Sequence, residues 1–122
     1  MITYQHLLST VDSETPTGAC CIALHNGVLV GSLGLSLRHP VAHINALFVE
    51  PAYQGMGIAK SLLKVAATLS HEQGKQTITL TVHRKNTRAR YLYFGLGFRP
   101  CGNGKCPDYV LMQVDVTNLK NP

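Results

Sequence analysis

The chain has 122 residues, of which 45% are hydrophobic and 14% are charged, and its formal net charge is +5. These values suit a single globular domain over residues 1–122 and exclude a disordered segment. No apolar run is long enough to cross a bilayer and the first residues do not resemble a signal peptide, so we expect a cytoplasmic protein without a membrane partner. The basic residues form no tail and are not interleaved with aromatic residues, which argues against a nucleic-acid partner.

The first 18 residues are weakly patterned. We expect a short strand over 2–4, one or two helical turns over 5–10, and a polar loop over 12–18 that contains Pro16.

A hairpin follows. Two apolar, β-prone runs at 20–24 and 28–37 are joined by His25-Asn26-Gly27. Asn-Gly between such runs indicates a tight hairpin turn, because both turn residues must tolerate positive φ. After a turn over 38–40, residues 41–49 predict a third strand, which Pro51 ends.

The pattern then changes to a helical period. Apolar residues recur from Ile58 to Leu69 at helical spacing, and Gly74 follows as a natural helix end. Residues 77–82 alternate between apolar residues and threonine, which is typical of a strand. Strand, helix and strand in this order predict a βαβ unit with parallel strands and a right-handed crossover.

The rest of the chain predicts a second helix over 87–94 and a last strand over 109–116. We therefore expect an α/β (α+β mixed) fold. Its central mixed β-sheet has antiparallel N-terminal strands, a parallel pair in the βαβ unit and two main helices.

A glycine-containing segment from Gln54 to Ser61 lies between the third strand and the first helix. The first N–H groups of a helix lack intrahelical partners and glycines let a phosphate approach, so the segment suits a pyrophosphate; the alternative is a tight turn without a ligand. Ala59 precedes Lys60-Ser61, which excludes a P-loop, and Lys60 takes the place of the third glycine of a Rossmann fingerprint.

The segment fits Q-x-x-G-x-G/A, and residues 86–98 fit N-x-x-A-x-x-L-Y-x-x-x-G-F. These two motifs resemble those of the GNAT superfamily of acyl-CoA-dependent N-acetyltransferases. The resemblance covers about residues 20–116 and is specific over 47–98. It implies a splayed parallel strand pair, pantetheine along the first of these strands and pyrophosphate on the loop. The cofactor-binding residues that it implies are Leu47, Phe48, Val49, Gln54, Gly55, Met56, Gly57, Ile58, Ala59, Lys60, Asn86 and Tyr93.

The implied activity is transfer of an acetyl group from acetyl-CoA to a primary amine of a small molecule or protein, by direct attack in a ternary complex. Acetyl-CoA is the co-substrate and no metal takes part. The alternative is a non-catalytic acyl-CoA-binding or regulatory module of the same fold. Asn86, which matches the family's cofactor-contacting asparagine, is also a favoured helix N-cap.

The resemblance assigns Tyr93 as the acid that protonates the departing thiolate, although a core tyrosine on the same apolar helix stripe is the alternative. Thr81 stands where some relatives carry a glutamate base, so the base comes from elsewhere. His43 is the first candidate, because alternation places it on one face with Asn45 and Leu47. Glu50 competes but is expected to face water, and His83 is a further candidate.

Only 17 residues precede Gly18, whereas most family members have two helices there. We therefore expect an open acceptor site or one completed by the second subunit of a homodimer. The spacing of the four cysteines fits no zinc site, and we expect reduced thiols. A disulfide between Cys101 and Cys106 is the alternative.

Overall fold

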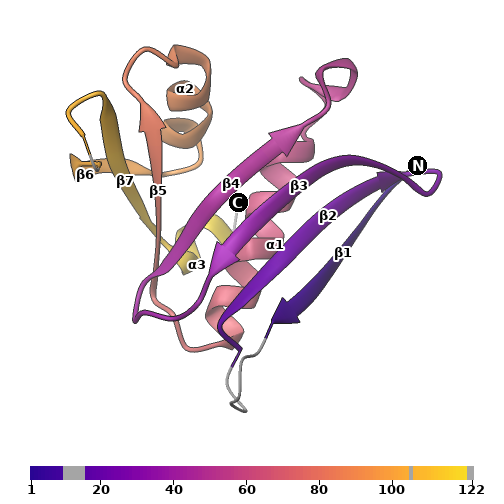
Figure 1. The fold of residues 1–122 in the computed structure, drawn as a ribbon, viewed down its shortest axis with the longest axis horizontal. Coiled ribbons are helices and arrows are strands. Elements are labelled where there is room, and N and C mark those ends of the chain that lie inside the picture. Colours follow the sequence, from indigo (N-terminus) through magenta and orange to yellow (C-terminus); the bar gives the residue numbers. More distant parts are fainter. Residues whose placement is uncertain (10–15, 105, 121–122) are drawn as a thin grey trace.

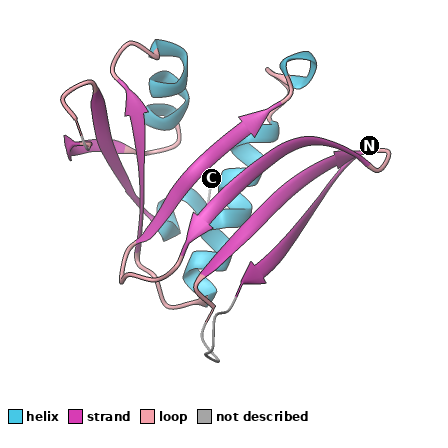
Figure 2. Ribbon diagram, viewed as in Figure 1, coloured by secondary structure: helices cyan, strands magenta, loops and turns pink. Residues whose placement is uncertain are grey.

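The computed structural model describes residues 1–9, 16–104 and 106–120. Within them, seven strands form one mixed sheet in the order β1-β2-β3-β4-β5-β7-β6, and Figures 1 and 2 show the arrangement. The elements are β1 (Ile2–Ser9), β2 (Gly18–His25), β3 (Val28–Ser36), β4 (Ala42–Val49), the 3₁₀ helix η1 (Pro51–Tyr53), α1 (Ile58–Glu72), β5 (Thr77–His83), α2 (Thr87–Gly95), β6 (Arg99–Asn103), β7 (Tyr109–Asp115) and α3 (Val116–Lys120).

The predicted hairpin is confirmed. β2 and β3 pair antiparallel, and Asn26 and Gly27 both have positive φ, at 52° and 82°. The prediction of helical turns after Tyr4 is wrong over residues 5–9, which continue β1 and pair with β2. Residues 5–9 form a strand and not a helix because the N–H and C=O groups along this edge of β2 need hydrogen-bond partners. Residues 10–15, which hold most of the predicted loop, lie outside the described residues.

The βαβ unit is confirmed as well, and its two strands splay. β4 and β5 pair in parallel only at Ala42 with Ile78 and at His43 with Thr79. Figure 1 shows the two strands close together at their first residues and apart at their last, with η1 beyond β4 and α2 beyond β5. The divergence makes a V in the middle of the sheet.

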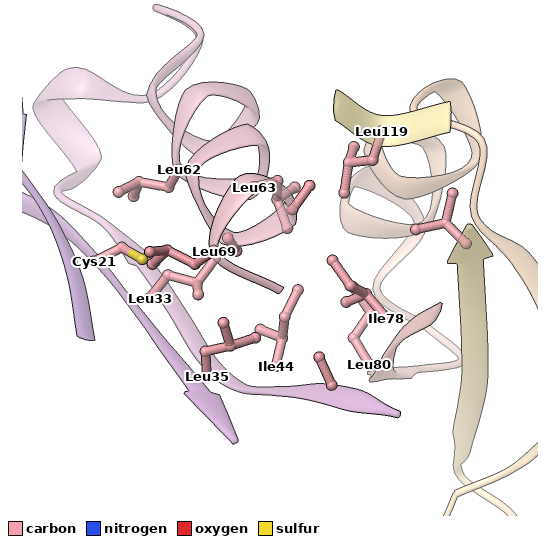
Figure 3. Close-up of a cluster of buried hydrophobic side chains, with 14 of the residues drawn as sticks. Cys21, Leu33, Leu35, Ile44, Leu62, Leu63, Leu69, Ile78, Leu80 and Leu119 are labelled. Atoms are coloured by element: carbon pink, nitrogen blue, oxygen red, sulfur yellow. The ribbon is translucent and has the colours of Figure 1, made fainter. Parts of the chain in front are cut away.

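The sheet is buried on one face, which we call the helix side. Paired residues such as Leu80 and Met112 are buried there, whereas Thr81 and Gln113, which alternate with them, are exposed. α1 packs against β2, β3 and β4, and α3 packs against α1 and β7. Figure 3 shows leucines of α1 and α3 facing the apolar side chains of the sheet. We call the other face, on which the described side chains are exposed or half-buried, the open side.

A β-bulge in β4 changes which side chains share a face. Ile44 and Ala46 pair with consecutive residues of β3, so Asn45 is an extra residue in the strand. Leu47 therefore lies on the helix side with Ile44 and packs against the core. His43 lies on the open side. The prediction that His43 and Leu47 share a face is wrong, because the extra residue shifts the alternation by one.

Three elements were not predicted: η1, β6 and α3. β6 is an exposed edge strand that contains Pro100 and an irregular register, and α3 adds a short third helix to the two expected. No helix among the described residues has the length and apolar character that a membrane span requires. All four cysteines are free: Cys21 is buried and the other three are exposed. Burial, together with the neighbouring Cys20, raises the pKa of the Cys21 thiol to about 11.

Candidate active site

A cavity of about 500 Å³ lies between the diverging ends of β4 and β5. Crevices beyond the carboxyl ends of parallel strands are the usual ligand sites of open α/β sheets. β4, the end of η1 and the loop after it, the first turn of α1, and α2 with its N-cap all contribute to its wall. The lining residues are Leu47, Val49, Tyr53, Gln54, Gly55, Gly57, Ile58, Ala59, Lys60, Asn86, Arg88, Ala89, Leu92 and Tyr93.

The loop between η1 and α1 is shaped by two glycines. Gly55 and Gly57 have φ of 84° and 82°, and a Cβ on either would meet no atom within 4 Å. The first helical hydrogen bond of α1 runs from the Ser61 N–H to the Gly57 carbonyl, so the N–H groups before Ser61 have no acceptor within the helix. Open space above a helix N-terminus with such donors suits the oxygens of a phosphate.

The charged side chains of the cavity wall have one sign. Lys60 from α1 and Arg88 from α2 line it, and none of its lining residues is an Asp or Glu. Opposite walls thus present cations to the same space. The cavity therefore favours an anionic ligand at its loop end.

Tyr93 from α2 lines the same cavity. Its ring packs edge-on against the buried Phe98, with ring centroids 5.7 Å apart and an interplanar angle of 61°. Burial raises the pKa of the Tyr93 phenol above its ordinary value. An ordinary tyrosine already keeps its proton at neutral pH, as a proton donor requires, and burial acts in the same direction.

Two of the expected polar ligands have structural hydrogen bonds as well. Asn86 is the N-cap of α2 and its Oδ1 accepts from the Ala89 N–H at 3.2 Å. Gln54 Nε2 donates to the Val49 carbonyl at 3.2 Å, which closes the turn before the loop. Both side chains also line the cavity, so each combines a structural contact with a place at the site.

Most of the residues predicted to bind the cofactor come together at this cavity. Two do not line it: Phe48 lies on the open side and is 49% exposed, and Met56, in the loop, is 62% exposed. Alternation explains Phe48, because its neighbours Leu47 and Val49 face the helix side.

The two candidate bases also lie off the cavity wall. His43 sits at the point of the V, where its Nδ1 lies 2.7 Å from Thr79 Oγ1. Glu50 is exposed and caps η1 without a side-chain hydrogen bond. Glu50 follows His43 by seven residues, which is roughly 20 Å along an extended strand. The two therefore belong to opposite ends of the site.

Several cavity residues were not singled out as ligands from the sequence. Tyr53, Arg88, Ala89 and Leu92 line the wall. Of these, Ala89 and Leu92 are fixed positions of the second motif, whereas Tyr53 and Arg88 are not part of either motif. Tyr53 precedes the loop directly, but its role depends on a partner that lies 28 residues away. No local pattern could reveal that contact.

Comparisons with known proteins agree with this geometry. A model of the acetyltransferase (GNAT) family matches residues 2–98. Peptidyl-lysine N-acetyltransferase YjaB of Salmonella typhimurium is 35% identical over 66 residues, which are 54% of this chain and 42% of that protein. The chain thus spans less than half of this curated relative.

Two solved structures share the fold. The ribosomal-protein-S18-alanine N-acetyltransferase of Escherichia coli has a TM-score of 0.79 at 20% identity and covers 95% of this chain and 94% of its own. The PaiA N-acetyltransferase of Thermoplasma acidophilum, in complex with coenzyme A, has a TM-score of 0.74 at 24% identity. The match covers 79% of this chain and 59% of that protein.

Proposed function

Because the chain belongs to the acetyltransferase (GNAT) family, we propose that it transfers an acetyl group from acetyl-CoA to a primary amine. One observation carries the proposal. A single cavity combines an open glycine loop at a helix N-terminus, two cations without a lining carboxylate, and a tyrosine whose phenol pKa is raised by burial. The first two features suit the phosphates of coenzyme A, and the third suits its thiol end.

The residues present fit this co-substrate. The N–H groups between Gly55 and Lys60 would hold the pyrophosphate, with Lys60 and Arg88 adding charge. β4 pairs with β5 only at Ala42 and His43, so the β5-side edge of β4 at Leu47 and Val49 has no partner strand among the described residues and can pair with the amides of a pantetheine arm. A solved structure with the same fold is in complex with coenzyme A, which supports this co-substrate.

When bound, acetyl-CoA supplies a thioester whose acetyl carbon forms the new bond to the amine nitrogen while the carbon–sulfur bond breaks. Tyr93 holds a proton at its phenol oxygen for the sulfur that departs. A positioned phenol suits this step because it acts over hydrogen-bond distance and stays neutral beforehand.

The amine must lose a proton before it attacks. A lysine-like amine has a pKa of about 10.4, so holding it neutral at pH 7 costs roughly 4.6 kcal/mol. We assign the base to His43, which stands on the open side at the point of the V, where an amine can approach the split in the sheet. Glu50 is the second candidate, but it belongs to the loop end of the cavity.

The hydrogen bonds around His43 support this role. Thr79 Oγ1 lies 3.4 Å from the Ala42 carbonyl, which can only accept, and 2.7 Å from His43 Nδ1. When the Thr79 hydroxyl donates its hydrogen bond to the Ala42 carbonyl, the hydroxyl oxygen accepts a hydrogen bond from His43 Nδ1–H. The imidazole then carries its lone pair on Nε2. The tautomer is then fixed by two strands of the sheet.

An acceptor screen tests the proposal. Product formation from acetyl-CoA is followed by mass, together with thiol release, for lysine peptides, free amino acids and small polyamines. Lysine peptides come first, because the matched Salmonella relative is named for peptidyl lysine. Three cysteines are exposed, so the thiol readout needs a blank with protein alone. Binding of acetyl-CoA without turnover of any acceptor would instead favour a non-catalytic acyl-CoA-binding module.

A further inference from the structure

A hydrogen bond joins the β2–β3 hairpin to the start of the glycine loop. The hydroxyl of Tyr53, the last residue of η1, lies 2.7 Å from Nδ1 of His25, the last residue of β2. The two rings also pack edge-on, with centroids 5.4 Å apart and an interplanar angle of 70°. Both side chains are half-buried. This contact spans 28 residues of sequence and ties the last residue of η1 to the hairpin. A backbone hydrogen bond of 2.8 Å from the Glu50 N–H to the Val30 carbonyl ties the residue before η1 to the same hairpin.

The loop that follows has little packing of its own. Residues 54–57 are all exposed, and the two glycines have open space where a side chain would lie. The position of its N–H groups therefore depends on how the two ends of the loop are held. α1 holds the end at Gly57 through the first helical hydrogen bond, from Ser61. Tyr53 and the turn bond of Gln54 hold the beginning.

We propose that His25 is a positioning residue for the cofactor loop: it holds the Tyr53 hydroxyl and thereby fixes the loop in the conformation that receives the phosphates. The inference rests on the proposed function, because it takes the loop as the acetyl-CoA site. Tyr53 transmits the effect directly, since its ring also lines the cavity. Holding the loop in advance lowers the ordering cost of binding.

The pair should affect binding rather than chemistry. It lies at the loop end of the cavity, whereas Tyr93 contacts Phe98 and stands on α2. Loss of the hydrogen bond would leave the proton donor where it is. The affinity for acetyl-CoA should therefore fall while the turnover number stays unchanged at saturating co-substrate.

The experiment is a double-mutant cycle on acetyl-CoA binding, measured by calorimetry, with kcat and KM measured beside it. Tyr53→Phe and His25→Ala should each raise the dissociation constant and the KM for acetyl-CoA about threefold to tenfold, as expected for one hydrogen bond. The double variant should bind no worse than either single variant, because each change removes the same bond. His25→Asn should restore much of the affinity, because its amide reaches the position of Nδ1.

Tyr109→Phe is the matched control. Tyr109 packs edge-on against His83 in the same way, with centroids 5.1 Å apart and an angle of 77°, but neither lines the cavity. This variant should bind acetyl-CoA like the parent. Thermal unfolding without ligand checks that each variant is folded. If His25→Ala is unfolded, Tyr53→Phe carries the test, because it keeps the ring and removes only the hydroxyl of the same hydrogen bond.

Two results would overturn the inference while the parent binds acetyl-CoA. One is a dissociation constant of acetyl-CoA for Tyr53→Phe that equals the parent's. The other is a double variant whose rise in dissociation constant is the product of the two single-variant rises. A fall in kcat without a change in KM would also contradict a positioning role. Failure of the parent to bind acetyl-CoA would instead remove the proposed function and this inference with it.

Discussion

His43 and Thr79 are joined by a hydrogen bond of 2.7 Å across the last rung at which β4 and β5 pair. Beyond this rung the strands separate, and the cavity occupies the helix side of the opening. The His43 side chain lies on the open side because it alternates with the buried Ala42 and Ile44, and the bulge at Asn45 places Leu47 on the opposite, helix side. We therefore expect acetyl-CoA and the amine to reach the point of the V from opposite faces of the sheet.

Removal of the Tyr93 hydroxyl should slow turnover with little effect on binding. Tyr93→Phe keeps the ring and its edge-on contact with Phe98. We expect kcat to fall about 100-fold, within the usual range for one general acid, and the dissociation constant of acetyl-CoA to stay within about twofold. Steady-state kinetics and calorimetry measure the two effects separately.

The pKa of Tyr93 also predicts a pH profile. The acid form is the active one, and burial raises the pKa of the Tyr93 phenol above its ordinary value. Any loss of kcat from this group should therefore appear only at a higher pH than for an ordinary tyrosine, which a pH–rate profile of the parent measures. A Tyr93→Phe enzyme with the parent's rate would make Tyr93 a core residue only.

A methyl group at Gly57 should remove acetyl-CoA binding. Gly57 has positive φ and opens the space that the phosphates need. Saturating acetyl-CoA should stabilise the parent by about 2.7 kcal/mol at a hundredfold excess over the dissociation constant. Gly57→Ala should lose most of this ligand-dependent rise in melting temperature.

Gly74→Ala is the matched control for this strain. Gly74 has φ of 78° and equally open surroundings, but it lies beyond the other end of α1. Alanine at either position must adopt a positive φ, which destabilises both variants by a similar amount. Without ligand, both should therefore have a lower melting temperature than the parent. Equal ligand shifts in the two variants would argue against phosphate binding at Gly57.

Arg88 should contribute to affinity through its charge. Arg88→Gln should raise the dissociation constant of acetyl-CoA about threefold to tenfold at low salt, and the difference should shrink at high salt. Arg90→Gln is the control, since it removes an equal charge from the same helix; Arg90 Nη1 donates to the Arg84 carbonyl and lines a different hollow. An equal loss in both variants would indicate the general positive field of the protein rather than Arg88.

The fold could be predicted where the local signal and the tertiary structure agree. Asn26-Gly27 indicates its hairpin because the turn needs two positive φ values, and both are present. The helical period from Ile58 likewise locates α1. The strand over 5–9 and β6 could not be predicted in this way. Both lie at an edge of the sheet and are mostly exposed, so their sequences show little alternation of apolar and polar residues.

The site could be predicted only where its motif is local. The loop from Gln54 to Gly57 sits at a helix N-terminus as expected. The face of His43 could not be predicted, because a single bulge residue reverses the alternation. The contact between Tyr53 and His25 depends on packing of distant segments. Side-chain partners of this kind follow from the fold and not from spacing.

The pH dependence of turnover distinguishes His43 from Glu50 as the base. With His43 as the base, kcat/KM should decline below about pH 6 to 7, because an ordinary imidazole titrates near 6.5. His43→Gln should lower kcat and remove this acidic limb, whereas Glu50→Gln should leave both intact, since Glu50 is exposed at the loop end of β4. Thr79→Val tests the tautomer, because it keeps the imidazole but removes the hydroxyl that lies 2.7 Å from Nδ1. The acidic limb of kcat/KM should remain in this variant while kcat falls.

Loss of the acidic limb in Glu50→Gln would instead assign the base to that carboxylate. If neither side chain matters, the amine loses its proton before it binds or through ordered water, and the rate should then rise with pH as the free amine becomes neutral.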